Sequence, residues 1–105
     1  MSTPKIDMAP NVVSEDGLKE RLSEGWQIEV VCKKAGEKRH ANWYGAWGVR
    51  IISPDGQTER TLVTFRKDMD QRLFRTANGL ISFLVDCGVR IPSVPVHEGD
   101  RAPQK

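Results

Sequence analysis

The chain has 105 residues, of which 38% are hydrophobic and 29% charged, which is typical of one small soluble globular domain and excludes collagen-like, fibrous and wholly disordered proteins. Its 16 Lys and Arg and 14 Asp and Glu give a net charge of +2, too balanced to identify a partner. No apolar run approaches the roughly 20 residues that span a bilayer, and no signal-peptide pattern follows Met1. Because two cysteines cannot form a disulfide framework, we expect a cytoplasmic protein without membrane contact.

The chain divides into three segments by composition. Residues 1–12 mix prolines and charges without periodicity and predict a flexible N-terminal arm. Residues 97–105 are polar and predict a flexible C-terminal tail. Residues 13–96 are then a single α+β domain.

A short helix is predicted at the start of this domain. Ser14 fits its N-cap, because a serine hydroxyl can accept a free backbone N–H of the first turn. Glu15 and Asp16 follow where the helix dipole favours negative charge. Gly25 suits the left-handed residue that ends a helix.

Three strands are expected next, over residues 26–33, 43–52 and 57–65, with a loop over 34–42. The sequence Ser53-Pro54-Asp55-Gly56 predicts a tight turn between the second and third strands. Alternation indicates which side chains face the core. These are Trp26, Ile28, Val30, Cys32, Trp43, Trp47 and Val49.

The turn also predicts the register. If Ser53 lies opposite Gln57, then Gly45 faces Phe65, whose ring would cover the bare glycine backbone. The same register places Arg50 directly opposite Arg60 on the other face of the sheet. Like charges facing each other are mildly unfavourable, and an anionic ligand would relieve that repulsion.

A long C-terminal helix is predicted over residues 69–87. Asp68 and Gln71 have the spacing of a capping box, and Gly88 suits the helix end. The expected fold is therefore α-β-β-β-α: a short N-terminal helix, a three-stranded antiparallel meander, and a long C-terminal helix packed on one sheet face, with the other face left open.

Positive charge is concentrated in the sheet and its loops: residues 1–32 carry a net −3 and residues 33–75 a net +5. Such a stripe can bind a polyanion, although a solvated charged face gives the same pattern. The leading hypothesis is a small nucleic-acid-binding domain that uses the open face, mainly through electrostatic and weakly sequence-specific contacts. The predicted contact residues are Lys33, Lys34, Lys38, Arg39, Tyr44, Arg50 and Arg60.

The alternative hypothesis is a protein–protein module or homodimer. In that case Val89–Val96 would add a strand at a sheet edge, and Leu62 and Val31 would be exposed interface residues.

Catalysis is not expected. Cys32 and Cys87 are predicted to be small buried hydrophobes, and no spacing brings either to a histidine. The cysteines and histidines have no zinc-ligand spacing, and no cofactor motif is present, so neither a metal nor a cofactor is expected.

Overall fold

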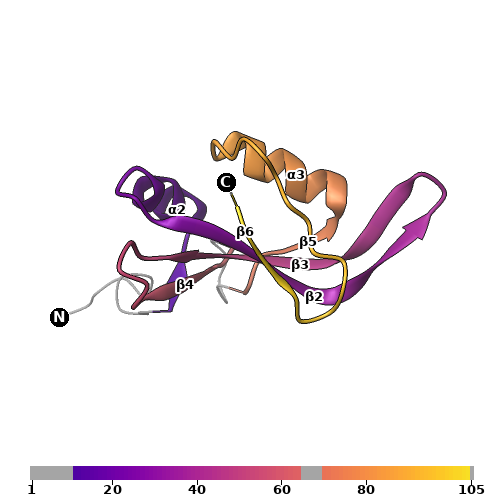
Figure 1. Cartoon of the computed structure of the whole chain (residues 1–105), viewed down its shortest axis with the longest axis horizontal. Coiled ribbons are helices and arrows are strands. Elements are labelled where there is room, and N and C mark those ends of the chain that lie inside the picture. The colour runs from indigo at the N-terminus through magenta and orange to yellow at the C-terminus, as the bar shows by residue number, and fades with distance from the viewer. Residues whose placement is uncertain (1–10, 65–69, 105) are drawn as a thin grey trace.

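The computed structural model describes residues 11–64 and 70–104, which form one six-stranded mixed sheet and two short helices (Figure 1). The strand order is β1-β4-β3-β2-β6, and β5 pairs with the part of β3 that β4 leaves free. All strand pairs are antiparallel except β1 with β4. The elements are β1 (Val12–Val13), α2 (Glu15–Leu22), β2 (Gln27–Arg39), β3 (Asn42–Ile52), β4 (Glu59–Leu62), β5 (Leu73–Thr76), α3 (Ala77–Asp86) and β6 (Arg101–Pro103).

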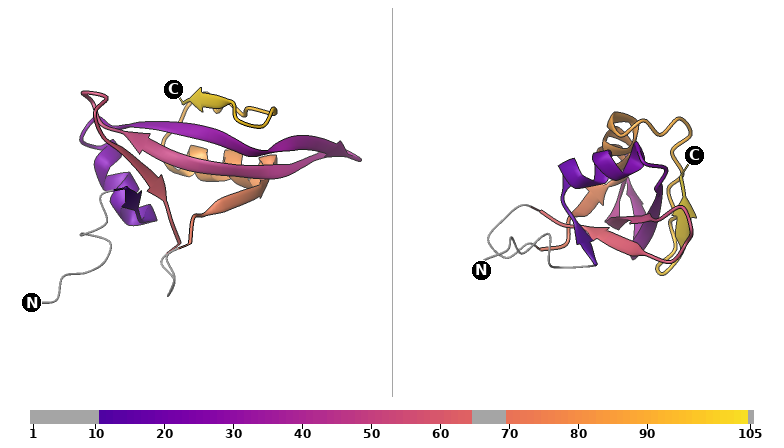
Figure 2. Two further views of the ribbon diagram at one scale, coloured as in Figure 1. Left: turned by 90° about the horizontal axis from the view of Figure 1, so that it is seen from below. Right: turned by 90° about the vertical axis from the view of Figure 1, so that its left-hand side faces the viewer.

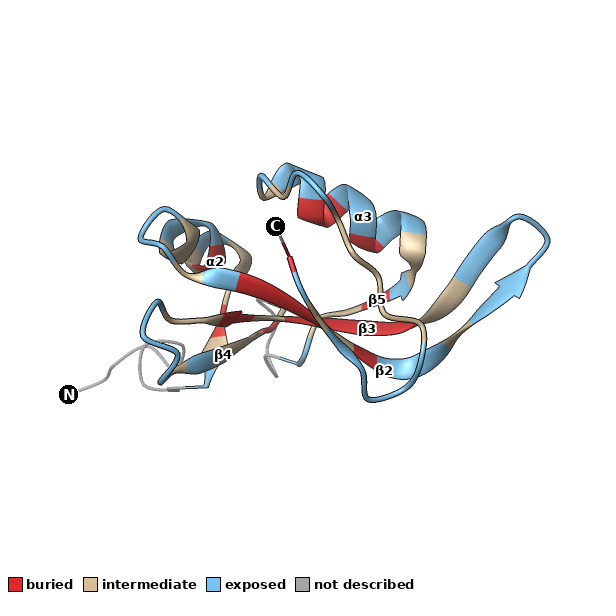
Figure 3. Cartoon of the chain, viewed as in Figure 1, coloured by how far each residue is buried: buried red, intermediate tan, exposed pale blue. Residues whose placement is uncertain are grey.

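Both helices lie on the same side of the sheet (Figures 1 and 2). The core forms between them and the sheet face that carries Ile28, Val30, Trp47, Val49 and Ile51, each at most 3% exposed. Figure 3 shows this buried band along the middle of the sheet and on the inner side of α3. The inward-facing positions predicted for Ile28, Val30, Cys32, Trp47 and Val49 are confirmed. The core position predicted for Trp43 is wrong, because its side chain is 40% exposed.

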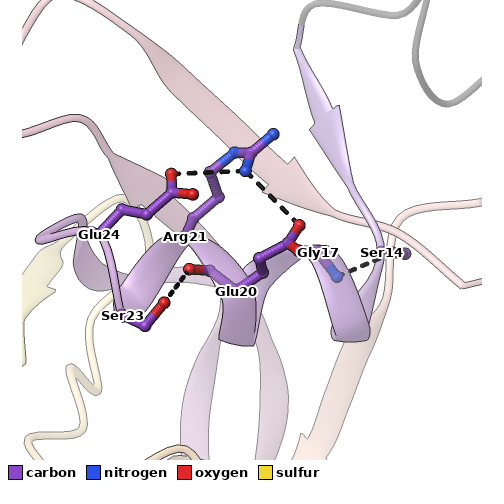
Figure 4. Close-up of polar contacts among 6 residues, drawn as sticks. All are labelled: Ser14, Gly17, Glu20, Arg21, Ser23 and Glu24. Atoms are coloured by element: carbon purple, nitrogen blue, oxygen red, sulfur yellow. Dashed lines mark hydrogen bonds and ion pairs between the residues drawn. The ribbon is translucent and has the colours of Figure 1, made fainter.

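Helix α2 begins after Ser14, whose hydroxyl accepts the backbone N–H of Gly17 at 3.1 Å (Figure 4). The cap predicted at this serine is confirmed. On the solvent side, Arg21 is flanked by Glu20 and Glu24 at 3.6 and 3.4 Å, so its charge is matched locally.

The predicted fold class is wrong, because the three-stranded meander is replaced by the six-stranded mixed sheet and the long helix is absent. Gln71 bridges to Val63 and residues 73–76 form β5, so that, among the described residues of the predicted long helix, the helical ones are 77–86. Thr76 caps α3 by accepting the N–H of Gly79 at 3.1 Å. Asp68 of the expected capping box lies outside the described residues, and so does Phe65, the predicted neighbour of Gly45.

The predicted register between the second and third strands is also wrong, by one residue. Arg50 pairs with Thr61, and Arg60 pairs with Ile51. The turn contains one residue more than predicted, because the N–H of Ser53 donates to the carbonyl of Thr58.

The segment predicted as a loop over residues 34–42 is strand except at residues 40 and 41, which form a turn. It forms the outer half of a hairpin, and we call residues 34–44 the hairpin arm. The arm projects beyond the helices at one end of the molecule and is largely exposed (Figures 1 and 3). Its two-residue turn uses His40 at φ 60°, the positive value that primed hairpin turns require. Two bulges on β2, between Cys32 and Lys34 and between Lys34 and Glu37, lie where the arm joins the body.

The C-terminal segment runs along the edge of β2, where the N–H of Gly36 donates to the carbonyl of Val96 at 2.8 Å and the N–H of Cys32 donates to the carbonyl of Asp100 at 2.9 Å. Residues 89–96 are not a strand, and the carbonyl of Pro95 accepts the indole N–H of Trp47 at 2.6 Å. Within the region predicted as a flexible tail, β6 pairs with β2. Gln104, 4% exposed, makes three side-chain hydrogen bonds to the backbone of Ser93 and Ala102.

Candidate nucleic-acid interface

The sheet face opposite the helices carries most of the predicted contact residues. The register places Glu29 beside Arg50 and Val31 beside Gly48 on this face, which we call the open face. Its basic residues are Lys33, Lys34, Arg39, Arg50, Arg75 and Arg101. Its acidic residues are Glu29, Glu37 and Glu59.

Arg50 lies at the centre of the open face, but it is a structural residue. Its Nε donates to Glu29 at 2.7 Å and its Nη1 lies 3.0 Å from Glu59. The side chains of Arg50 and Glu29 are only 15% and 11% exposed, so the two charges are largely buried together. A guanidinium held in this way has little free surface for a ligand, because its charge is already compensated.

Arg60 lies on the opposite side of the sheet from Arg50. Since its register partner Ile51 faces the core, Arg60 packs on the helix side. Its guanidinium carbon lies 5.3 Å from the ring centroid of Trp26, and its Nε is buried without a hydrogen-bond partner among the described residues. The predicted Arg50–Arg60 pair is therefore absent, and Arg60 is not part of the open face.

A hollow of about 240 Å³ lies where the hairpin arm joins the body, between β2, β3 and β5. Three cations line it, Lys34, Arg39 and Arg75, together with the ring of Tyr44. The guanidinium carbon of Arg39 lies 4.6 Å from the Tyr44 ring centroid, a cation–π stack. The structure thus brings together Lys34, Arg39 and Tyr44 of the predicted site.

Backbone shape creates this hollow. The bulged backbone of β2 passes so close to Gly45 that a Cβ there would lie 2.9 Å from the carbonyl oxygen of Lys34 and 3.3 Å from that of Ala35. Only glycine allows this approach, so Gly45 permits the bend that opens the space beside Tyr44.

The two remaining predicted residues lie away from the hollow. Lys33 lines a smaller depression of about 90 Å³ on the open face, near Gly48 and Arg50. The side chain of Gln71 crosses above Gly48, where a Cβ would lie 2.5 Å from its amide nitrogen. Lys38 pairs with Trp43 and therefore faces the other side of the arm from Tyr44.

Arg75 is the site residue that the sequence interpretation missed. It lay inside the predicted long helix, where nothing connected it with the strands. Thr76, Asn78 and Gly79 could have indicated the correct helix start, because a threonine N-cap at residue 76 leaves Arg75 in extended backbone beside Tyr44.

The cysteines are both free thiols. Cys32 is 1% exposed in the core, and burial raises the pKa of its thiol. Cys87 is half-buried at the end of α3, and burial raises its thiol pKa as well. Both cysteines therefore hold their protons more tightly than a free thiol. Within residues 11–64 and 70–104 there is no group of three metal-ligating side chains.

For the alternative hypothesis of a protein–protein module or homodimer, one of the two predicted interface residues is not at the surface. Leu62 is fully buried in the core, whereas Val31 is half-buried on the open face. None of the described helices is both long and apolar enough to cross a bilayer.

The chain was compared with known protein families, curated proteins and solved structures. No family model, no curated protein and no solved structure matches it.

Proposed function

We propose that this chain binds nucleic acid, mainly by electrostatic contacts, through the basic part of the open face, including the side of the hairpin arm that carries Tyr44. The observation that carries the proposal is the hollow at the arm, where Lys34, Arg39 and Arg75 line the same space as Tyr44 and, among the described residues, Glu37 is the one acidic residue in the lining. Aromatic rings flanked by cations are the usual means of holding a nucleic-acid strand without reading its sequence.

The cations at the hollow are less neutralised by neighbouring carboxylates than Arg50 is. Among the described residues, Lys34 and Arg75 are in no ion pair, and Arg39 has only the exposed Glu37 at 3.6 Å. Arg50, in contrast, is held by two carboxylates. Unpaired cations can release counterions when they meet phosphates, and this release supplies most of the affinity in weakly specific binding.

The site lies along a surface and is not enclosed. Lys33 continues the basic surface from the hollow toward Arg101 on β6. A row of cations on a sheet face fits an extended polyanion better than a small anion, because successive phosphates can be contacted in turn.

With its two free thiols the chain also suits a reducing compartment such as the cytoplasm.

Titration of fluorescent DNA and RNA oligomers at low and moderate salt tests the proposal. We expect binding at low salt that weakens steeply as salt rises, with a slope of log K against log salt of about −0.7 to −0.9 per contacted phosphate. Arg75→Ala should weaken binding and reduce the slope by about that amount.

Arg21→Ala is the matched control for this titration. It removes the same charge from α2, on the helix side of the sheet, where Glu20 and Glu24 already neutralise it. Affinity of this variant should equal that of the unmodified chain. Failure of every oligomer to bind at low salt would rule out the proposed function.

Self-association stays a prediction. Light scattering over a range of protein concentrations measures it directly, and a mass equal to one chain at the highest concentration would dismiss a homodimer.

A further inference from the structure

We infer that the hollow at the hairpin arm holds an unpaired base, so that the ligand is a single-stranded nucleic acid and not a duplex. This inference rests on the proposed function and narrows it to one class of ligand.

The size of the hollow favours one planar group. At about 240 Å³ it is smaller than the roughly 300–1,000 Å³ of pockets that enclose whole small molecules. It is also open to solvent along the sheet, since Lys34, Glu37 and Arg39 in its lining are exposed. A site of this kind can accept part of a long ligand while the rest continues along the surface.

Two flat groups in the lining offer stacking surfaces. The Tyr44 ring and the Arg39 guanidinium stack on each other at 4.6 Å, and both line the hollow. Bases stack on tyrosine rings and on arginine planes alike. In a duplex both faces of a base are already covered by its neighbours, so only an unpaired base has a face free for this contact.

The position of the ring argues in the same direction. Tyr44 is half-buried at the base of the arm, whereas the more exposed aromatic, Trp43 at 40%, lies on the arm's other side with Lys38. A rigid duplex could reach a protruding side chain on the arm, but not a ring recessed between β2 and β5. A flexible single strand can insert one base there.

The cations are placed for the phosphates on either side of that base. Lys34 comes from β2 and Arg75 from β5, so they lie on different strands around the Tyr44 ring. A base stacked in the hollow would have its two neighbouring phosphates near these two charges. The hollow therefore has the components of a single-strand site: a stacking surface and flanking cations.

The test compares a fluorescent single strand of about 16 nucleotides, the upper end of usual single-domain site sizes, with the duplex of the same sequence. We expect the single strand to bind at least about tenfold more tightly. Tyr44→Leu should weaken single-strand binding by about 5- to 150-fold, the usual loss when one stacking ring is removed. Tyr44→Phe, which keeps the ring, should bind as the unmodified chain does.

Lys34→Ala and Lys38→Ala form a matched pair, because both remove one lysine from the same strand of the arm, on opposite faces. Only the change at Lys34 should lower single-strand affinity and the salt slope. Thermal melting of each variant shows whether it is folded. If Tyr44→Leu melts early, the comparison of single strand with duplex on the unmodified chain still tests the inference. Equal binding of duplex and single strand, or equal affinity of the two tyrosine variants, would overturn the inference and leave the proposed function standing. No binding to either ligand would overturn both.

Discussion

Replacing Arg50 should damage the fold much more than it damages a binding site. Arg50→Met leaves Glu29 largely buried, 11% exposed, with Arg101 at 4.0 Å as its nearest remaining cation. Breaking a buried ion pair by removing one partner costs about 3–5 kcal/mol. Because both groups keep some exposure and Arg101 remains, we expect a loss of about 2–4 kcal/mol in the free energy of unfolding. For a domain of this size that lowers Tm by about 10–20 °C.

Urea denaturation and thermal melting by circular dichroism measure this loss. The double variant Glu29→Leu/Arg50→Met should be more stable than Arg50→Met alone, because no buried charge is left without a partner. Lys33→Met, an exposed residue of the same face, should change stability by less than about 0.5 kcal/mol. Glu59→Gln should also have a small effect, below about 1 kcal/mol, since the Glu59 side chain is 51% exposed.

A different outcome would refute the reasoning. If Arg50→Met melts within a few degrees of the unmodified chain and loses nucleic-acid affinity, then Arg50 is a ligand contact and its pairing with Glu29 is unimportant for the fold.

Three further predictions concern stability and reactivity. Thr76→Ala should cost about 1 kcal/mol by removing the cap of α3, measured by urea denaturation. Trp47→Phe should lower the free energy of unfolding by about 1–3 kcal/mol, because the carbonyl of Pro95 loses its donor at 2.6 Å. The loss is larger if the space left by the indole does not close, and thermal melting measures it. Alkylation by iodoacetamide at neutral pH should be slower at Cys87 than at a free thiol, because its raised pKa leaves less thiolate, and slower still at Cys32, which is 1% exposed. Mass spectrometry of the time course would contradict this order if Cys32 reacted first.

Local chemistry could be predicted from the sequence where it needs no distant partner. The Ser14 cap depends only on the residues that follow it, and the inward positions of Ile28, Val30, Trp47 and Val49 follow from strict alternation along each strand. These features are fixed by the backbone geometry of a helix end or a strand.

The register prediction was wrong because of one residue in the turn. The carboxylate of Asp55 accepts both the Ser53 hydroxyl at 2.6 Å and the N–H of Gln57 at 3.0 Å, so Gln57 becomes part of the turn. Pairing then resumes at Thr58. Because a shift of one residue reverses the face of every side chain beyond it, Arg60 moved to the helix side of the sheet.

The prediction of a long helix was wrong because the apolar residues fit both the helical and the strand periodicity. The apolar residues between Leu73 and Leu84 recur at helical spacing, yet Phe74 pairs with Trp47 and faces the core from a strand. Short apolar runs fit both patterns, and the choice depends on β3, which offers a free edge to residues 73–76. The edge strand β6 could not be predicted for a similar reason, since Gln104 finds its partners at Ser93 and Ala102 only in the folded chain.

The bulge at Lys33 has a consequence for how this surface could change between related sequences. In a bulge two residues of one strand oppose a single residue of the next, so Lys33 and Lys34 both present their side chains to the open face. Deleting position 33 would remove this bulge, and it would leave Cys32 opposite Trp47 and Lys34 opposite Ala46 as they are. The strand can therefore gain or lose a cation through a change in chain length alone, with every other side chain still facing the same way.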